Sequence, residues 1–249
     1  AGTVVPIVAS GCSTNPDTGR NQLMLVGSDQ IAAMAASAWT DMKRQTPISR
    51  DRGLNTRVNR IMDKIAVSSN RSDQEWELQV FDTDDVNAFV MPGNKVGVYR
   101  GLTEMTENDD QIATVIGHEV GHVVGRHSAE RFSQQILGQV ALVGAQIAVS
   151  QSDSLKQYGQ EIAVLGGAAL QFGVLLPYSR QHEYEADRLG VDYMYRAGYQ
   201  VKEAPRLWDL MDARSQGQRP LEFMSTHPYP QNRKNELVSY INARGYDLV

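Results

Sequence analysis

Apolar residues in this chain recur mostly at helical spacing, and they alternate with polar residues only in a few short segments. The pattern predicts two helices that begin near the capping residues Ser28 and Asp51 and two more towards the C-terminus, at 28–46, 51–67, 202–215 and 231–243. Strands are predicted at 22–26, 77–81, 87–90 and 96–99. We therefore expect an α+β fold, mainly α, with a small sheet.

Residues 129–176 have the least regular pattern. Two segments rich in Gly, Ala and other apolar residues, 136–149 and 162–176, flank a polar stretch. Glutamines interrupt both segments and neither reaches 18 uninterrupted apolar residues, so we do not expect membrane spans here. A close-packed helical hairpin is the simplest interpretation, and a lid over a neighbouring site is the alternative.

The helix with the clearest start follows Asn108. This capping residue is followed by two first-turn acids, by Gln111 and then by an apolar run. The same helix contains an H-E-x-x-H sequence formed by His118, Glu119 and His122. Because residues four apart share a helix face, the two imidazoles can bind one metal ion with the glutamate beside them, as in zinc peptidases.

The surroundings of the two histidines decide between a metal site and a surface helix. Apolar residues continue past them at Val123 and Val124, which predicts a buried helix whose polar face looks into the protein. Buried imidazoles need partners, and a metal ion is a natural one. A surface helix that carries two histidines is the alternative.

A catalytic zinc also needs a third protein ligand and an open position. The metzincin pattern would place a histidine at position 128, but that residue is Ser128 and the nearby histidine is His127. In a continuous helix His127 would lie about 140° around from His122 and could not reach the same ion. We therefore predict that His127 stabilises the C-terminal end of this helix through the helix dipole.

A carboxylate from a second helix is the better third ligand. The segment that begins at Ser179 has a capping residue and a helical pattern. It carries Glu183 and Asp187 on one face, whereas Glu185 points roughly the opposite way. Glu183 can bind the metal while Asp187 holds the free N–H of a ligand histidine. An ordinary acidic helix is the alternative.

The composition fits a compact enzyme and argues against two other classes of protein. With 249 residues, 41% of them hydrophobic, the chain can bury a full core as one domain. With a net charge of -5 and dispersed Lys and Arg, the sequence has no basic cluster of the kind that binds nucleic acid. Cys12 is the only cysteine and is far from the motifs, so we expect neither a thiol peptidase nor an internal disulfide.

The N-terminal segment predicts attachment to a membrane. Residues 1–11 are uncharged and apolar, and Ala9-Ser10-Gly11-Cys12 resembles a lipobox, the cleavage and acylation site of bacterial lipoproteins. No initiator Met and no basic segment precede it, so we expect the sequence to begin within a signal peptide. Cys12 would then carry lipid and tether the protein to a bacterial membrane, the outer membrane in our prediction, with the enzyme in the periplasm. An incidental cysteine is the alternative.

The motifs together resemble a known family. H-E-V-G-H at 118–122, E-Y-E-A-D at 183–187 and H-P-Y-P-Q-N-R at 227–233 occur in that order, with N-A-F upstream at 87–89. This pattern is similar to that of the HtpX and CAAX-prenyl-protease family of gluzincins, metallopeptidase family 48. The resemblance spans most of residues 28–244 and is strongest to the periplasmic lipoprotein branch, which includes LoiP and the catalytic domain of BepA.

The resemblance implies the fold and the metal site. The fold would be a gluzincin zinc-peptidase domain with a small mixed β-sheet beside the H-E-x-x-H helix. One Zn²⁺ per chain would be bound by His118, His122 and Glu183, with Glu119 as the general base and Asp187 supporting a ligand from behind.

The resemblance also implies roles around the metal. His227 would steady the oxyanion or occupy the fourth ligand position in a resting enzyme, although a histidine before Pro228 would by itself be an ordinary loop residue. Arg233 would order the same loop or hold substrate backbone. The edge formed by Asn87, Ala88 and Phe89 would pair with an extended peptide, and a purely structural sheet is the alternative.

These observations predict a zinc-dependent metalloendopeptidase that hydrolyses extended polypeptides, in particular misfolded or misassembled envelope proteins. Its peptidase domain would span 28–249, after a residual leader and N-terminal arm at 1–27. The alternative is a chaperone-like binding protein that keeps the zinc-peptidase fold without hydrolysis. Glu119 favours the enzyme, because a binding protein has no chemical need for a general base. An integral prenyl protease is disfavoured, because membrane spans are not expected.

Overall fold

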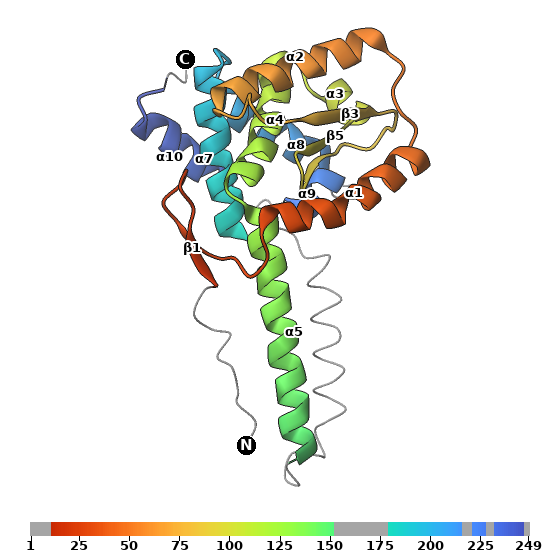
Figure 1. The fold of residues 1–249 in the computed structure, drawn as a ribbon. Helices are drawn as coiled ribbons and strands as arrows, with labels where there is room; N and C mark the ends of the chain where they lie inside the picture. Colours follow the sequence, from red (N-terminus) through yellow and green to blue (C-terminus); the bar gives the residue numbers. More distant parts are fainter. Residues whose placement is uncertain (1–10, 152–178, 216–220, 228–231, 247–249) are drawn as a thin grey trace. The chain divides into compact units, whose positions relative to one another are not determined.

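The computed structural model describes residues 11–151, 179–215, 221–227 and 232–246, without the side chains of 139–140 and 142–151 (Figure 1). Two compact units are distinguished by their internal contacts. One combines Ser28–Ser128 with Tyr178–Val249, and the other combines Ala1–Gly27 with Ala129–Pro177. The predicted division into a leader with an arm (1–27) and a peptidase domain (28–249) stays a prediction.

The first unit is mainly helical. Its described helices are α1 (Ser28–Gln45), α2 (Arg52–Ser68), α3 (Arg100–Met105), α4 (Asp109–Val124), α7 (Arg180–Arg196), α8 (Glu203–Ser215), α9 (Glu222–Thr226) and α10 (Arg233–Ala243). The helices expected from the apolar pattern are present with small shifts at their ends, and the short helices α3 and α9 were not predicted. The α+β, mainly α, class is confirmed.

A small mixed sheet accompanies these helices. The strand order is β3 (Glu77–Phe81), β5 (Lys95–Tyr99), β4 (Ala88–Met91), with β5 parallel to β3 and antiparallel to β4. The turn between β4 and β5 contains Gly93 and Asn94, both at positive φ, a conformation that Gly and Asn adopt most readily. The predicted small mixed sheet is confirmed.

The two outer edges of this sheet differ. The segment before α2 covers part of the β3 edge, because Ser49 N donates to Val80 O at 2.9 Å and Asp82 N donates to Pro47 O at 2.7 Å. In the described part of the chain, β4 pairs with β5 alone. We call the second edge of β4, which pairs with no strand among the described residues, its open edge.

The two faces of the sheet pack against different helices. On one face, alternate side chains join those of α2 and α4 in the main hydrophobic core, namely Val80, Ala88, Val90, Val96 and Val98. On the other face, the ring of Phe89 lies 6.3 Å from that of Trp39 in α1 and 6.1 Å from that of Tyr99. The sheet is thus held between a helical core layer and an aromatic cluster.

Helices α4 and α7 run side by side at very close range (Figure 1). A Cβ added at Gly121 would lie 2.7 Å from the carbonyl oxygen of Ala186, and one at Gly117 would lie 3.0 Å from that of Gly190. Glycines therefore let the two backbones touch. This contact brings the first turns of α7 beside the histidines of α4.

Both helices begin at the predicted capping residues. Asn108 Oδ1 accepts a hydrogen bond from Gln111 N at 2.9 Å, and Gln111 Oε1 accepts one from Glu107 N at 2.9 Å. Ser179 Oγ accepts from His182 N at 3.2 Å. The caps satisfy backbone donors that would otherwise have no partner and fix where each helix starts.

The second unit contains an antiparallel hairpin of β1 (Cys12–Thr14) and β2 (Asn21–Leu23), together with the part of α5 (His127–Gln151) from Ala129 onward. Arg20 binds both oxygens of Glu130, at 2.9 and 2.5 Å. The second half of the predicted helical hairpin, 162–176, lies outside the described residues. Among the helices that the structure describes, none is long and apolar enough to cross a membrane.

Candidate metal centre

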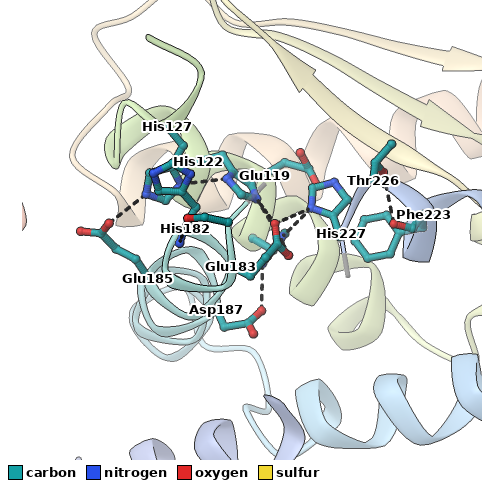
Figure 2. Close-up of polar contacts among 12 residues, drawn as sticks. Glu119, His122, His127, His182, Glu183, Glu185, Asp187, Phe223, Thr226 and His227 are labelled. Atoms are coloured by element: carbon teal, nitrogen blue, oxygen red, sulfur yellow. Dashed lines mark hydrogen bonds and ion pairs between the residues drawn. The ribbon is translucent and has the colours of Figure 1, made fainter. Parts of the chain in front are cut away.

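Four buried side chains converge at the contact of α4 and α7, and their ligand-type atoms all lie within 4.8 Å of one another: His118, His122, Glu183 and His227. Figure 2 labels three of them, His122, Glu183 and His227. His118 Nε2 and His122 Nε2 are 3.0 Å apart, and each lies 3.4 Å from an oxygen of Glu183. Nδ1 of His227, which directly follows α9, is 3.2 Å from both His118 Nε2 and Glu183 Oε1.

These separations match those of ligands around one small cation. Four atoms placed tetrahedrally at zinc–ligand distances of about 2.0 to 2.2 Å would lie roughly 3.3 to 3.6 Å apart. A cation at the centre of the group would satisfy all of these ring nitrogens and carboxylate oxygens together, whereas one N–H···N hydrogen bond would satisfy only two ring nitrogens. The residues therefore fit a metal ion, with the nitrogen and oxygen donors that zinc accepts.

Glu119 lies beside this group and is 1% exposed. Neither of its carboxylate oxygens has a hydrogen-bond partner among the described residues, and His227 Nε2 lies 3.3 Å from Oε1. Burial raises the pKa of Glu119, an effect that His227, His118 and the backbone N–H of Val90 only partly offset. A buried carboxylate with a raised pKa is well suited to accept a proton.

A buried carboxylate and guanidinium support His118 from behind. Asp187 Oδ1 lies 2.9 Å from His118 Nδ1, so the imidazole can donate there and direct Nε2 into the cluster. Arg233 donates from Nε and Nη2 to the two oxygens of Asp187 at 2.5 and 2.8 Å. Its Nη1 lies 2.6 Å from Glu183 Oε2, and its guanidinium carbon lies 4.2 Å from the ring centroid of Trp208.

The protonation states of the three proposed ligands follow from these contacts. Burial would lower the pKa of His118, but hydrogen bonds to Asp187 and Glu183 raise it to about 9. Burial lowers the pKa of His122 well below its usual value. Burial would raise the pKa of Glu183, but the charge of Arg233 holds it well below its usual range. Metal binding must therefore displace a proton from His118 but not from the other two ligands.

The surroundings of Arg233 bear on its two predicted roles, which are ordering the loop and holding substrate backbone. The residue is 0% exposed, and its guanidinium is engaged by Asp187 and Glu183. These contacts favour a role in ordering the site, and contact with a substrate backbone stays a prediction.

The predicted substrate-binding segment lies at the start of β4. The side chains of Asn87 and Ala88 are buried, and the ring of Phe89 packs in the aromatic cluster. Any contact of this segment with a peptide would therefore use the backbone of the open edge.

The position of His127 shows that its predicted role was wrong. Helix α4 ends at Val124 and Arg126 adopts a left-handed backbone with φ 54°, so the chain reverses and His127 begins α5. His127 Nδ1 then lies 2.8 Å from His122 Nδ1, and its Nε2 lies 2.9 Å from Glu185 Oε2 (Figure 2). The prediction assumed a continuous helix, in which this contact cannot form.

Comparison with known proteins gives the family. The model of the family described as "Peptidase family M48" matches residues 53–241, most of the chain. The chain belongs to peptidase family M48. The family resemblance predicted from the motifs is thereby confirmed, and the fold described above is that of an M48 gluzincin domain.

Relatives within the M48 family come from bacteria and from mitochondria. The chain is 38% identical over 188 residues to the mitochondrial metalloendopeptidase OMA1 of Schizosaccharomyces pombe, covering 74% of this chain and 52% of the relative. It is 27% identical over 234 residues to the beta-barrel assembly-enhancing protease of Escherichia coli, covering 93% and 48%. The mitochondrial OMA1 of Bos taurus is 29% identical over 238 residues, covering 90% and 45%. The chain thus spans about half the length of these relatives.

Sequence reasoning missed two features of this M48 site. The first is the backbone contact between α4 and α7, for which the spacing of Gly117 and Gly121 on one helix face was an available signal. The second is the turn that returns His127 to His122, for which the sequence offered no signal beyond Gly125. The side chains of His118, His122 and Glu183, which were expected to face one metal ion, do lie together.

Proposed function

We propose that this M48 chain is a zinc-dependent metalloendopeptidase. The observation that carries the proposal is the set of separations of 3.0 to 3.4 Å among the ligand atoms of His118, His122 and Glu183, with Glu119 buried beside them. In this proposal the first three residues bind one zinc ion per chain, and Asp187 orients His118 through Nδ1.

The chain's own residues carry the proton transfers. A bound zinc ion would supply a Lewis acid that lowers the pKa of a water molecule and polarises the scissile carbonyl. Glu119, whose pKa is raised by burial, accepts the proton of that water and donates it to the leaving amine. No serine or cysteine nucleophile is required.

The open edge of β4 is the proposed site for an extended polypeptide. In the antiparallel pairing of β4 with β5, Tyr99 N donates to Asn87 O, so Phe89 and Met91 also face β5. The backbone groups of Ala88 and Val90 then point to the open edge. The backbone N–H of Val90 is among the groups that partly offset the raised pKa of Glu119, and its position near this carboxylate supports a peptide on this edge passing beside the general base.

His227 has two candidate roles, as the sequence indicated. Its Nδ1 is within 3.2 Å of both His118 Nε2 and Glu183 Oε1, a position inside the ligand group. This geometry favours the role in a resting enzyme, where His227 fills the fourth ligand position that water and substrate need. Support of the oxyanion is the alternative, and it would require the imidazole to withdraw from this position.

The cellular setting is a further part of the proposal. Cys12 is exposed in β1 and ends a lipobox-like sequence, which supports lipid attachment and a position on the periplasmic side of a bacterial membrane. Misfolded or misassembled envelope proteins are the proposed substrates. A relative named beta-barrel assembly-enhancing protease is in keeping with this setting.

The variant Glu119→Gln tests hydrolysis against the chaperone-like alternative. The amide cannot accept the proton of water, so we expect casein cleavage to fall by about 10²- to 10⁴-fold while zinc content and fold are unchanged. Glu104→Gln, the same change at an exposed position of α3, is the matched control and should keep full activity. Casein cleavage by Glu119→Gln at the wild-type rate would overturn the mechanism, and a wild-type protein that binds zinc but cleaves nothing would favour the binding protein.

A further inference from the structure

All five histidines of the chain are buried at this site, although the proposed metal chemistry uses only three of them. The two others are His127 and His182. Their rings stack on each other with centroids 4.4 Å apart and an interplanar angle of 18°. His127 is 0% exposed and also contacts a proposed metal ligand, so its contacts bear directly on the metal.

The contacts of His127 form a series of hydrogen bonds that leads away from the proposed metal position. His122 Nε2 faces the ligand group, and His122 Nδ1 lies 2.8 Å from His127 Nδ1. On the far side of the ring, His127 Nε2 lies 2.9 Å from Oε2 of Glu185, whose side chain is 14% exposed. Figure 2 shows the three side chains in this order.

When a metal is bound at His122 Nε2, these hydrogen bonds can run in a single direction, from His122 through His127 to Glu185. A neutral histidine that binds a metal through Nε2 carries its proton on Nδ1, so His122 must donate to His127 Nδ1. A neutral His127 that accepts on Nδ1 carries its own proton on Nε2 and donates it to the Glu185 carboxylate. Each link therefore fixes the tautomer and the ring orientation of the residue before it.

The turn after α4 provides a second, independent observation. Gly125 has helical dihedral angles, φ -66° and ψ -10°, so its backbone does not require glycine. A Cβ at Gly125 would lie 2.6 Å from Cε1 of His127, and all three of the nearest atoms that it would meet belong to that ring. Arg126 follows at φ 54°, a conformation that is unfavourable for a residue with a side chain. The local structure thus makes room for the His127 ring at some energetic cost.

We infer that His127 and Glu185 are positioning residues that orient His122 for metal binding, in parallel with Asp187 and Arg233 behind His118. The inference rests on the proposed metal site. In this inference each ligand histidine has its own support. The carboxylate of Asp187 contacts His118 directly, whereas His122 contacts the imidazole of His127, which in turn contacts the carboxylate of Glu185. Loss of either support should weaken metal binding by about 10- to 100-fold.

Zinc affinity, measured by competition with a chromophoric chelator, tests the inference without recourse to activity. His127→Phe keeps a flat ring but removes the acceptor, and we expect its zinc dissociation constant to rise about 10- to 100-fold. His127→Asn places an amide oxygen where Nδ1 was and should recover most of that loss. Glu185→Gln, which keeps an acceptor for Nε2–H, should raise the constant less than Glu185→Leu, which removes it.

The matched control lies on the same helix as Glu185. Asp192 is a mostly buried carboxylate of α7 that accepts from the hydroxyls of Tyr240 and Tyr246, and Asp192→Asn should leave zinc affinity unchanged. Melting of metal-free and zinc-loaded protein separates packing from positioning. A purely structural role would lower both melting temperatures equally, whereas a positioning role lowers the zinc-induced increase.

The variant Gly125→Ala gives the sharpest form of the test, because it removes no polar atom. The added Cβ would displace the His127 ring, so zinc affinity should fall although alanine is the better helix former. Wild-type affinity in both Gly125→Ala and His127→Phe would overturn the inference while leaving the metal site intact. A wild-type protein that binds no zinc would overturn the proposed function together with it.

Discussion

The close approach of α4 and α7 makes Gly121→Ala a demanding substitution. The new Cβ would lie 2.7 Å from Ala186 O and 2.9 Å from Ala186 Cα, both backbone atoms that cannot rotate away. Ordinary contact between such atoms needs about 3.4 Å or more, so α7 would have to retreat by roughly 0.5 to 0.7 Å. Forced overpacking of this kind costs about 1 to 3 kcal/mol, and the gain in helix propensity from Gly to Ala returns up to about 1 kcal/mol.

We therefore expect Gly121→Ala to lower the free energy of unfolding by about 1 to 2 kcal/mol, measured by urea denaturation of metal-free protein. Because Glu183 is on the same helix as Ala186, the retreat also moves it from the histidines, and zinc affinity should fall. The matched control is Gly138→Ala in α5, where an added Cβ meets none of the described residues within 4 Å and stability should be kept or raised. Unchanged stability and zinc affinity in Gly121→Ala would refute the proposed role of the helix contact.

Three further variants test other parts of the site and its setting. Arg233→Leu leaves the buried carboxylates of Asp187 and Glu183 without the guanidinium that pairs with them. The free energy of unfolding, measured in the presence of a chelator, should therefore fall by about 3 to 5 kcal/mol. The control Arg188→Leu, at a half-exposed residue, should change this free energy little. His227→Ala should raise basal peptide cleavage at unchanged zinc content, and unchanged or reduced cleavage would argue against the resting-state role. Cys12→Ala should release the protein from the membrane fraction of its bacterial host with activity intact; mass spectrometry showing an unmodified native Cys12 would remove the basis for lipid attachment.

Local signals predicted the parts of the site that depend on one helix at a time. The cap at Asn108 and the H-E-x-x-H spacing predicted where α4 begins and which two imidazoles share a face. The spacing of Glu183 and Asp187 likewise predicted which two carboxylates of α7 share a face. Helical periodicity is a property of neighbouring residues, so a single sequence contains it.

Features that depend on tertiary contacts could not be predicted in the same way. The reversal at Arg126 replaces a helix that periodicity alone would continue, and it turns His127 from a helix-end residue into a partner of His122. The burial of Arg233 between two carboxylates depends on how α10 meets α7, which no local pattern encodes. In both places the energy of burial and pairing outweighs the local preference.

Zinc-edge anomalous diffraction from crystals of the zinc-loaded protein tests the metal assignment most directly. We expect a single anomalous peak at about 2.0 to 2.2 Å from Nε2 of His118, Nε2 of His122 and a carboxylate oxygen of Glu183. A peak ligated instead by His127 or Glu185, or no peak between α4 and α7, would contradict the proposed metal centre.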